Sequence, residues 1–258
     1  MRAGDSRTGK GADRCALLAF VGILLAVFSS CSSPPSTQPG DSGELEAQLR
    51  ADPDNAALAV ELAGVYSDRL MRPDGSDVDR LFDRATGILN HVLAKNPDHV
   101  DALLSLARVC DAPTPRRDER RAIELLERAV AVEPDNVLAV TMLAMKLSGN
   151  AAGVDRALMV VESALARDRK NTELLRTLAQ IHHFSPKPDL PGAAAAYERL
   201  IEAGGGTADV YTHQGMCLLA LRRSADAEAA YRNAIRDATE RGAEYDRRRA
   251  QEFLGRLY

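Results

Sequence analysis

Three short phrases built on Pro-Asp decide the fold: Asp52-Pro53-Asp54-Asn55, Asn96-Pro97-Asp98-His99 and Glu133-Pro134-Asp135-Asn136. Proline cannot continue an α-helix, because it lacks the backbone N–H and its ring clashes with the preceding turn. An Asp or Asn just after the proline can cap the helix that follows. Each phrase therefore marks the point where one helix ends and another begins.

Alignment on these phrases divides the chain into five segments: 56–99, 100–136, 137–171, 172–207 and 208–241. Each segment is expected to hold two helices, with its extra residues between them. Turn-rich sequence at 72–77 and 185–191 predicts exposed loops. The chain has no Trp and few β-branched or aromatic runs, which favours helices over strands.

The same order of small and large residues recurs in all five segments. It resembles the tetratricopeptide repeat, whose period is about 34 residues. The first helix carries a small residue where the two helices cross, namely Ala63, Ala107, Ala144, Ala179 and Gly215. The second helix carries Ala85, Ala122, Ala157, Ala193 and Ala227, followed four residues later by Leu89, Leu126, Val161, Tyr197 and Tyr231.

Small residues at these positions let two antiparallel helices nest, and the larger side chains fill the space beside them. A generic Ala-rich bundle also has small residues at helix crossings, but it has no reason to repeat one spacing five times. The resemblance implies an all-α solenoid of antiparallel helical hairpins that winds as a right-handed superhelix.

The sequences at the two ends of the array are interpreted as caps that cover the exposed apolar faces of the terminal repeats. Residues 44–55 resemble half a repeat. Residues 242–258 predict a capping helix whose apolar face carries Tyr245, Phe253, Leu254 and Leu257. The run Arg247-Arg248-Arg249 within this helix is interpreted as a solvated face.

The N-terminus resembles a bacterial lipoprotein signal. Residues 1–30 combine a basic start, an uncharged apolar stretch from Ala16 to Phe28 and small residues before Cys31. The resemblance implies cleavage before Cys31, a lipid such as palmitate on that residue, and a flexible linker through residue 43. Phe28 departs from the Leu usual in that family. A plain secretory signal and an uncleaved anchor remain as alternatives, although the stretch is shorter than the ~20 residues of a spanning helix.

All three interpretations carry the repeats across a membrane, into the periplasm or elsewhere outside the cytoplasm. The lipid reading places the chain on the bacterial cell membrane or the outer membrane. Without residues 1–30, 29 basic and 35 acidic residues are left, so nucleic acid is not an expected partner. Cys110 and Cys217 lie in distant repeats and are expected to be free, buried thiols.

In the tetratricopeptide family the first helix of each repeat lines a concave groove. Transferred to this chain, the resemblance implies a partner-binding groove that includes Leu104, Arg108, Met142, Met145, Arg176, Gln180, His183, His213 and Met216. Methionine adapts to irregular partners and arginine can clamp a carboxylate. The hypothesis is a peptide with an apolar anchor and an acidic group. The alternative is that the methionines are core residues at a shifted helical phase.

No catalytic residue, cofactor or metal site is expected. His213 and Cys217 are four residues apart on one helix, but no Glu or Asp completes a ligand set. His182 falls at a packing position. Gly204-Gly205-Gly206 is interpreted as a helix cap and joint, not as a phosphate loop.

The sequence therefore favours a non-catalytic, lipid-anchored scaffold that binds a protein or peptide. Similar bacterial repeat lipoproteins help to assemble envelope machines, but this analogy rests on the fold alone. A chaperone-like binder of exported clients, as in cytochrome maturation, is the alternative. A metal-dependent enzyme that uses His182, His183, His213 or Cys217 is the third hypothesis. The partner and the oligomeric state do not follow from the sequence.

Overall fold

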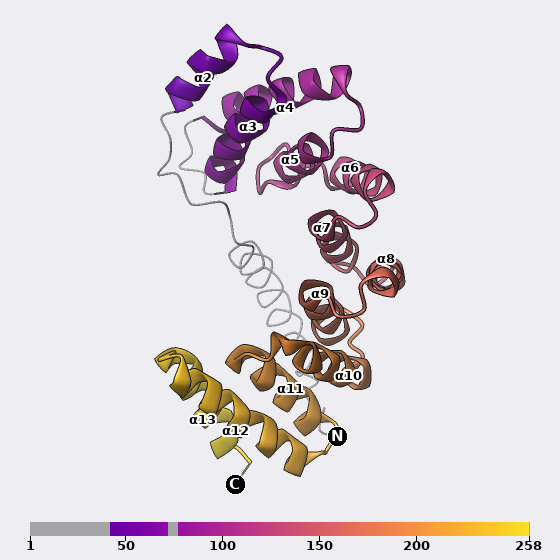
Figure 1. Ribbon diagram of the computed structural model, residues 1–258, viewed down its shortest axis with the longest axis vertical. Coiled ribbons are helices and arrows are strands. Elements are labelled where there is room, and N and C mark those ends of the chain that lie inside the picture. The colour runs from indigo at the N-terminus through magenta and orange to yellow at the C-terminus, as the bar shows by residue number, and fades with distance from the viewer. Residues whose placement is uncertain (1–41, 72–76, 258) are drawn as a thin grey trace, which may run out of the picture. The chain divides into compact units, whose positions relative to one another are not determined.

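The computed structural model describes residues 42–71 and 77–257, and every regular element within them is a helix (Figure 1). The predicted signal segment, Cys31, the linker up to residue 41 and most of the loop at 72–77 lie outside the described residues. The helices are α2 (Ser42–Ala51), α3 (Ala56–Met71), α4 (Val78–Lys95), α5 (Val100–Asp111), α6 (Glu119–Val132), α7 (Val137–Leu147), α8 (Val154–Arg167), α9 (Thr172–Phe184), α10 (Leu190–Leu200), α11 (Ala208–Ala220), α12 (Ser224–Glu240) and α13 (Glu244–Gly255). None of these helices is both long and apolar enough to cross a membrane.

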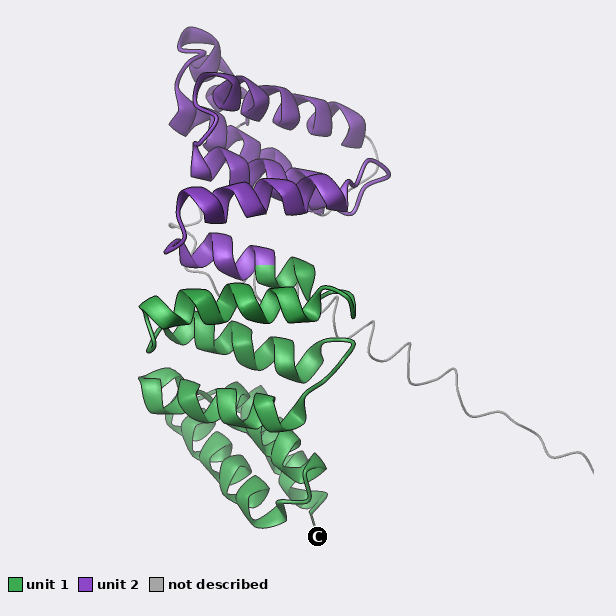
Figure 2. Ribbon diagram, turned by 90° about the vertical axis from the view of Figure 1, so that its right-hand side faces the viewer, with its two compact units in different colours: residues 1–30, 144–258 green, residues 31–143 purple. Residues whose placement is uncertain are grey.

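The described chain divides into two compact parts between Leu143 and Ala144, inside α7 (Figure 2). We refer to residues 42–143 as the N-terminal half and to residues 144–257 as the C-terminal half. In the N-terminal half α3 packs on α4 and α5 packs on α6. In the C-terminal half α9 packs on α10 and α11 packs on α12. The predicted all-α class and the pairing of consecutive helices are therefore observed in both halves.

The small residues predicted at the helix crossings are all buried. The nine alanines are at most 1% exposed, and Gly215 is buried as well. The larger residues that follow them in the second helices, from Leu89 to Tyr231, are also buried. Burial at these positions confirms the packing that the repeat pattern predicts.

The Pro-Asp phrases end one helix and cap the next, as expected. The capping residue stands two positions after the proline and accepts a hydrogen bond from a backbone N–H in the first turn. Asn55 accepts from Leu58 N, His99 Nδ1 from Ala102 N, and Asn136 from Ala139 N. These bonds satisfy donors that the helix itself leaves unpaired.

The second predicted loop is shorter than expected. Helix α10 already begins at Leu190, because Asp189 caps it by accepting from Gly192 N, and Pro191 fits the first turn, where a helix needs no N–H donor. Helix α10 continues into a π-helical turn, η1 (Ile201–Gly205), in which Gly204 has φ 90°. Only glycine adopts this conformation without strain, so the glycine run is a helix cap, as predicted.

Helix α2 is attached to the first helix pair by a polar clamp. The Glu46 carboxylate accepts from the Tyr66 hydroxyl at 2.6 Å and from both terminal nitrogens of Arg84 at 2.8 and 2.9 Å. No residue of α2 is fully buried, and Leu45 and Leu49 are half-buried. The hydrogen bond from Tyr66 lowers the pKa of Glu46; burial opposes this shift, and the charge of Arg84 adds to it. Docking of α2 therefore depends on an ionised carboxylate.

Helix α13 packs over α11 and α12, and of the predicted apolar face Phe253, Leu254 and Leu257 are half-buried, whereas Tyr245 is exposed. Ala250 is buried, and the Phe253 ring stacks on Tyr231 with centroids 5.8 Å apart. Tyr245 is 73% exposed, because it lies in the first turn, away from this contact. The interpretation of the arginine run as a solvated face is wrong for Arg249, which pairs with Asp209 of α11.

Two helical glycines give opposite expectations for substitution by alanine. A Cβ on Gly215 would lie 2.6 Å from the Tyr231 ring, whereas a Cβ on Gly87 of α4 would meet nothing within 4 Å. Alanine improves helix propensity by about 1 kcal/mol, and overpacking costs about 1–3 kcal/mol. We expect Gly87→Ala to raise the thermal unfolding midpoint and Gly215→Ala to lower it. If the unfolding midpoint rose in Gly215→Ala as well as in Gly87→Ala, the tight helix crossing at Gly215 would be contradicted.

Glu46→Gln should loosen α2 by about 1 kcal/mol, because the charge-assisted bonds to Tyr66 and Arg84 weaken. Glu44→Gln on the same helix is the control, since Glu44 bonds only to Gln48. The pKa of Glu46 lies below its ordinary 4.5, so this stabilisation is complete above about pH 4.5 and is lost as the pH falls through the folded-state pKa. Amide hydrogen exchange of α2 measures both effects. Equal exchange in the two variants would rule out the clamp.

Candidate functional site

Several predicted groove residues offer little surface to a partner. Leu104 and Met145 are 4% and 9% exposed, so these parts of the proposed apolar anchor are core side chains, at the shifted helical phase that the sequence left open. Met142 is half-buried on α7. Arg108 donates to the Asp68 carboxylate of α3 at 2.9 Å and is thus already engaged. Leu104, Arg108, Met142 and Met145 therefore form a weaker candidate site than the sequence suggested.

The C-terminal half brings two of the predicted residues together. His183 at the end of α9 and His213 on α11 face each other edge to face, with ring centroids 5.7 Å apart. Phe184 stacks on His183 at 4.0 Å and meets His213 edge-on at 5.2 Å. The Tyr197 ring of α10 lies 5.9 Å from the His183 ring and 6.2 Å from the His213 ring. These four side chains form a continuous ring cluster across three helices.

A closed ring of polar contacts joins this cluster to the C-terminal helix. His213 Nδ1 lies 3.3 Å from Asp209 Oδ2, and Arg249 of α13 lies 3.1 Å from Asp209 Oδ1 and 3.2 Å from His213 Nε2. Arginine can only donate, so His213 Nε2 must accept. In the neutral form of the ring, the proton is then on Nδ1, from which it is donated to Asp209. Both ring nitrogens of His213 are occupied.

The pKa values of these groups follow from their surroundings. Burial, with a contribution from nearby His213, lowers the pKa of His183 to about 4, so this imidazole is neutral above about pH 5. Burial acts to raise the pKa of Asp209, but the hydrogen bond from His213 and the charges of His213, Arg249 and Arg176 lower it overall. Burial raises the pKa of Tyr197 well above its ordinary value. The site therefore holds one carboxylate, two guanidinium groups and the neutral ring of His183 beside Phe184 and Tyr197.

Part of this site is open to solvent. The Asp209 side chain is 48% exposed, and Arg249 is about one-third exposed. Arg176 of α9, another predicted groove residue, is partly exposed and lies 4.0 Å from Glu173, too far for a hydrogen bond. Gln180 and Met216 are half-buried on α9 and α11. We define the C-terminal site as six partly exposed side chains together with the buried Tyr197 ring that packs against them; the six are Arg176, His183, Phe184, Asp209, His213 and Arg249.

Four members of this site did not stand out in the sequence. Phe184 and Tyr197 fit the repeat as ordinary packing residues. Asp209 stands four residues before His213, a spacing that allows a contact along a helix and could have been noticed. Arg249 carried no such signal, because its contact joins residues 40 positions apart.

The other histidines and the thiols offer no reactive arrangement. His182 Nδ1 lies 3.2 Å from the Asp189 carboxylate and is mostly buried, consistent with its predicted packing role. Cys110 and Cys217 are both free and buried, as predicted. Burial raises the pKa of Cys217 to about 12, so it stays a thiol and not a nucleophilic thiolate. Within the described residues, no three His, Cys, Asp or Glu side chains are placed to hold a metal ion.

Comparison with known proteins gives a match in structure but not in sequence. No protein-family model matches the chain, and no curated protein does so either. A MamA crystal structure is 21% identical and covers 71% of this chain and 94% of its own, with a TM-score of 0.52. Residues 41 to the end of MamA from Desulfovibrio magneticus RS-1 are 13% identical and cover 70% and 96% of the two chains, with a TM-score of 0.52.

YrrB, described as a TPR protein with an unusual peptide-binding site, is 15% identical and covers 81% of this chain and 97% of its own, with a TM-score of 0.53. These identities are too low to carry a function from one protein to another, but the similarity extends over nearly the whole of each solved chain. The paired helices, the buried alanines at their crossings and these neighbours agree: the chain has the tetratricopeptide-repeat fold.

Proposed function

We propose that this chain is a non-catalytic interaction scaffold of a bacterial envelope, and that its C-terminal site binds a peptide segment of another protein. One observation carries the proposal. Aromatic and imidazole rings from three helices lie beside partly exposed guanidinium and carboxylate groups on one surface. Such a combination of flat apolar faces and fixed charges is typical of energetically important interface residues.

The chemistry of the site suggests what the segment contains. An apolar or aromatic side chain can stack on Phe184 and on neutral His183, whose proton affinity is too low for a charge near neutral pH. A carboxylate of the segment can bind Arg176, whose own partner Glu173 lies 4.0 Å away. The peptide-binding site named for YrrB, a protein of similar fold, also supports a peptide as the ligand.

The state of the polar groups argues against catalysis at this site. A general base needs a ring nitrogen that can take up a proton from the substrate. Both nitrogens of His213 are engaged by Asp209 and Arg249. Cys217, four residues further along α11, is a protonated, buried thiol. The arrangement holds side chains in place and supplies no activated nucleophile.

The membrane part of the proposal rests on residues 1–43. The basic start, the short apolar stretch and Cys31 support a lipid on Cys31 that holds the repeats at the cell membrane or the outer membrane, outside the cytoplasm. The Pro- and Gly-containing linker would let the repeats extend some distance from the lipid-anchored residue. A lipid anchor concentrates the scaffold near other envelope proteins, which suits a binding role.

A crosslinking experiment tests the site. Gln180, replaced by p-benzoylphenylalanine in the full chain, should crosslink to one predominant protein in intact membranes of the producing bacterium. Arg176→Glu with Phe184→Ala should lower the yield at least tenfold, because the two interface anchors contribute on the order of 1–2 kcal/mol each. Arg232→Glu on the exposed side of α12 is the matched charge control and should leave the yield unchanged.

An equal yield from the double variant, with folding verified by circular dichroism, would falsify the site assignment. Crosslinks to many unrelated exported chains, in place of one predominant protein, would favour the chaperone-like alternative over a scaffold with a dedicated partner.

Metabolic labelling with an alkyne fatty acid tests the anchor. The full chain should incorporate the label and sediment with membranes. Cys31→Ser should abolish both, because the serine hydroxyl does not accept the lipid. Cys15→Ser, inside the segment that is expected to be removed, is the control and should leave labelling unchanged. Label that persists in Cys31→Ser would place the lipid elsewhere.

A further inference from the structure

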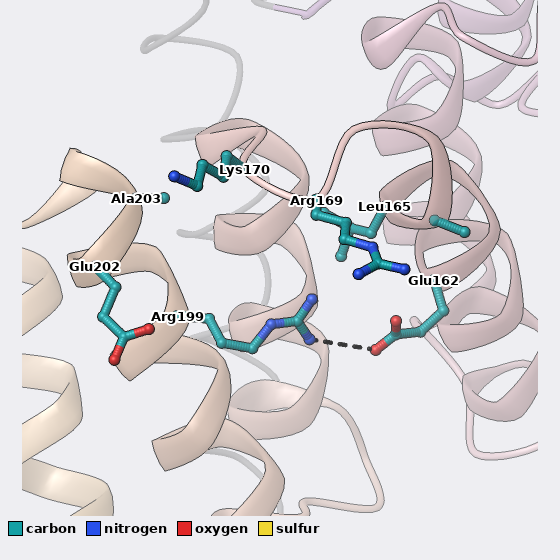
Figure 3. A pocket seen from close by; sticks show the side chains of 8 residues that line it. Glu162, Leu165, Arg169, Lys170, Arg199, Glu202 and Ala203 are labelled. Carbon is teal, nitrogen blue, oxygen red and sulfur yellow. Dashed lines mark ion pairs between the residues drawn. The ribbon is translucent and has the colours of Figure 1, made fainter.

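A cleft of about 590 Å³ opens between α8 and α10, away from the C-terminal site. Glu162, Leu165 and Ala166 of α8 and the following Arg169 form one side, with Lys170 beside them, and Arg199, Glu202 and Ala203 form the other (Figure 3). The volume is within the range of about 300–1,000 Å³ that ligand sites occupy. The C-terminal site is built on α9, α10, α11 and α13, and the two share no residue.

The floor of the cleft is apolar and its rim is charged. Leu165 is buried beneath it, and Ala166 and Ala203 are too small to fill it. The five other side chains of the wall and rim are all exposed, so the cleft is open along one side. An open cleft of this kind suits a segment of a protein better than a small molecule, which binding sites usually enclose.

The cations of the cleft are poorly satisfied by the chain itself. Arg199 Nη1 lies 3.7 Å from Glu162 Oε1, a distance that allows an ion pair but no hydrogen bond (Figure 3). Arg169 and Lys170 form no side-chain ion pair with any described residue. Three positive side chains therefore surround one apolar floor, and their donors are available to an anion.

We propose that this cleft is a second binding site, which takes an acidic side chain, Asp or Glu, of a protein segment. The carboxylate binds among Arg169, Lys170 and Arg199, and the aliphatic part of the segment covers Leu165, Ala166 and Ala203. Glu162 and Glu202 leave the wall with a net charge of +1. One carboxylate matches that charge, whereas a doubly charged phosphate would meet repulsion from both glutamates.

The test uses the full chain and short peptides, observed by saturation-transfer difference NMR. The probe is acetyl-Ala-Ala-Glu-Ala-Ala-amide, and the comparison peptides carry Gln or phosphoserine in the central position. We expect the Glu peptide to bind, with saturation strongest at its Glu methylenes, and the Gln peptide to bind about tenfold more weakly. Lys170→Glu should weaken the Glu peptide about tenfold. Lys187→Glu, an exposed charge in the α9–α10 loop, should leave it unchanged.

Ala166→Trp provides a variant that leaves the charges intact and fills the exposed floor; it should abolish binding of the Glu peptide. Equal binding of the Glu and Gln peptides, an unchanged affinity in Lys170→Glu, or an equal loss in Lys187→Glu would each overturn the proposal. Tighter binding of the phosphoserine peptide would overturn the choice of a carboxylate. Arg176→Glu with Phe184→Ala should not affect this peptide, so failure of one site is distinguishable from failure of the other.

Discussion

The structure depends on the close approach of paired helices at small residues. At each crossing an Ala or Gly of the first helix lies within a buried contact, and the second helix supplies another buried Ala. Van der Waals attraction is lost quickly as surfaces separate, so one larger side chain at a crossing forces the pair apart. At Gly215 even a single added carbon would lie 2.6 Å from the Tyr231 ring, closer than side-chain carbons normally approach. Everything else that the chain displays is built on helices held in this way.

The fold could be predicted because it rests on local and periodic constraints. A proline ends a helix wherever it stands, and Asn55, His99 and Asn136 cap helices through contacts only three residues long. The small residues at the crossings recur at one spacing in five segments. Each occurrence is weak evidence for the repeat, and the five together identify it. The same regularity places His183 and His213 on neighbouring first helices, and their contact at 5.7 Å was within reach of the repeat alignment.

The details of the sites were not predictable to the same degree, because they depend on contacts between distant residues and on small differences in helical phase. Leu104 and Met145 occupy groove positions in the alignment but turn into the core. Arg247, Arg248 and Arg249 look alike in the sequence, yet the first two pair with Glu244 on their own helix and only Arg249 reaches α11. The cleft depends on the spacing between α8 and α10, which no local pattern encodes.

The polar ring of Asp209, His213 and Arg249 gives the last helix a role beyond covering the array. Arg249 is the member of α13 that enters the C-terminal site, and its guanidinium is shared by two groups of α11. A ligand carboxylate that draws Arg249 away also removes a tie between α13 and α11, whereas a ligand that adds to the ring strengthens the tie. Occupancy of the site and attachment of α13 are therefore thermodynamically linked, with reciprocal effects. The C-terminal helix would report on the bound state of the scaffold through its own opening rate.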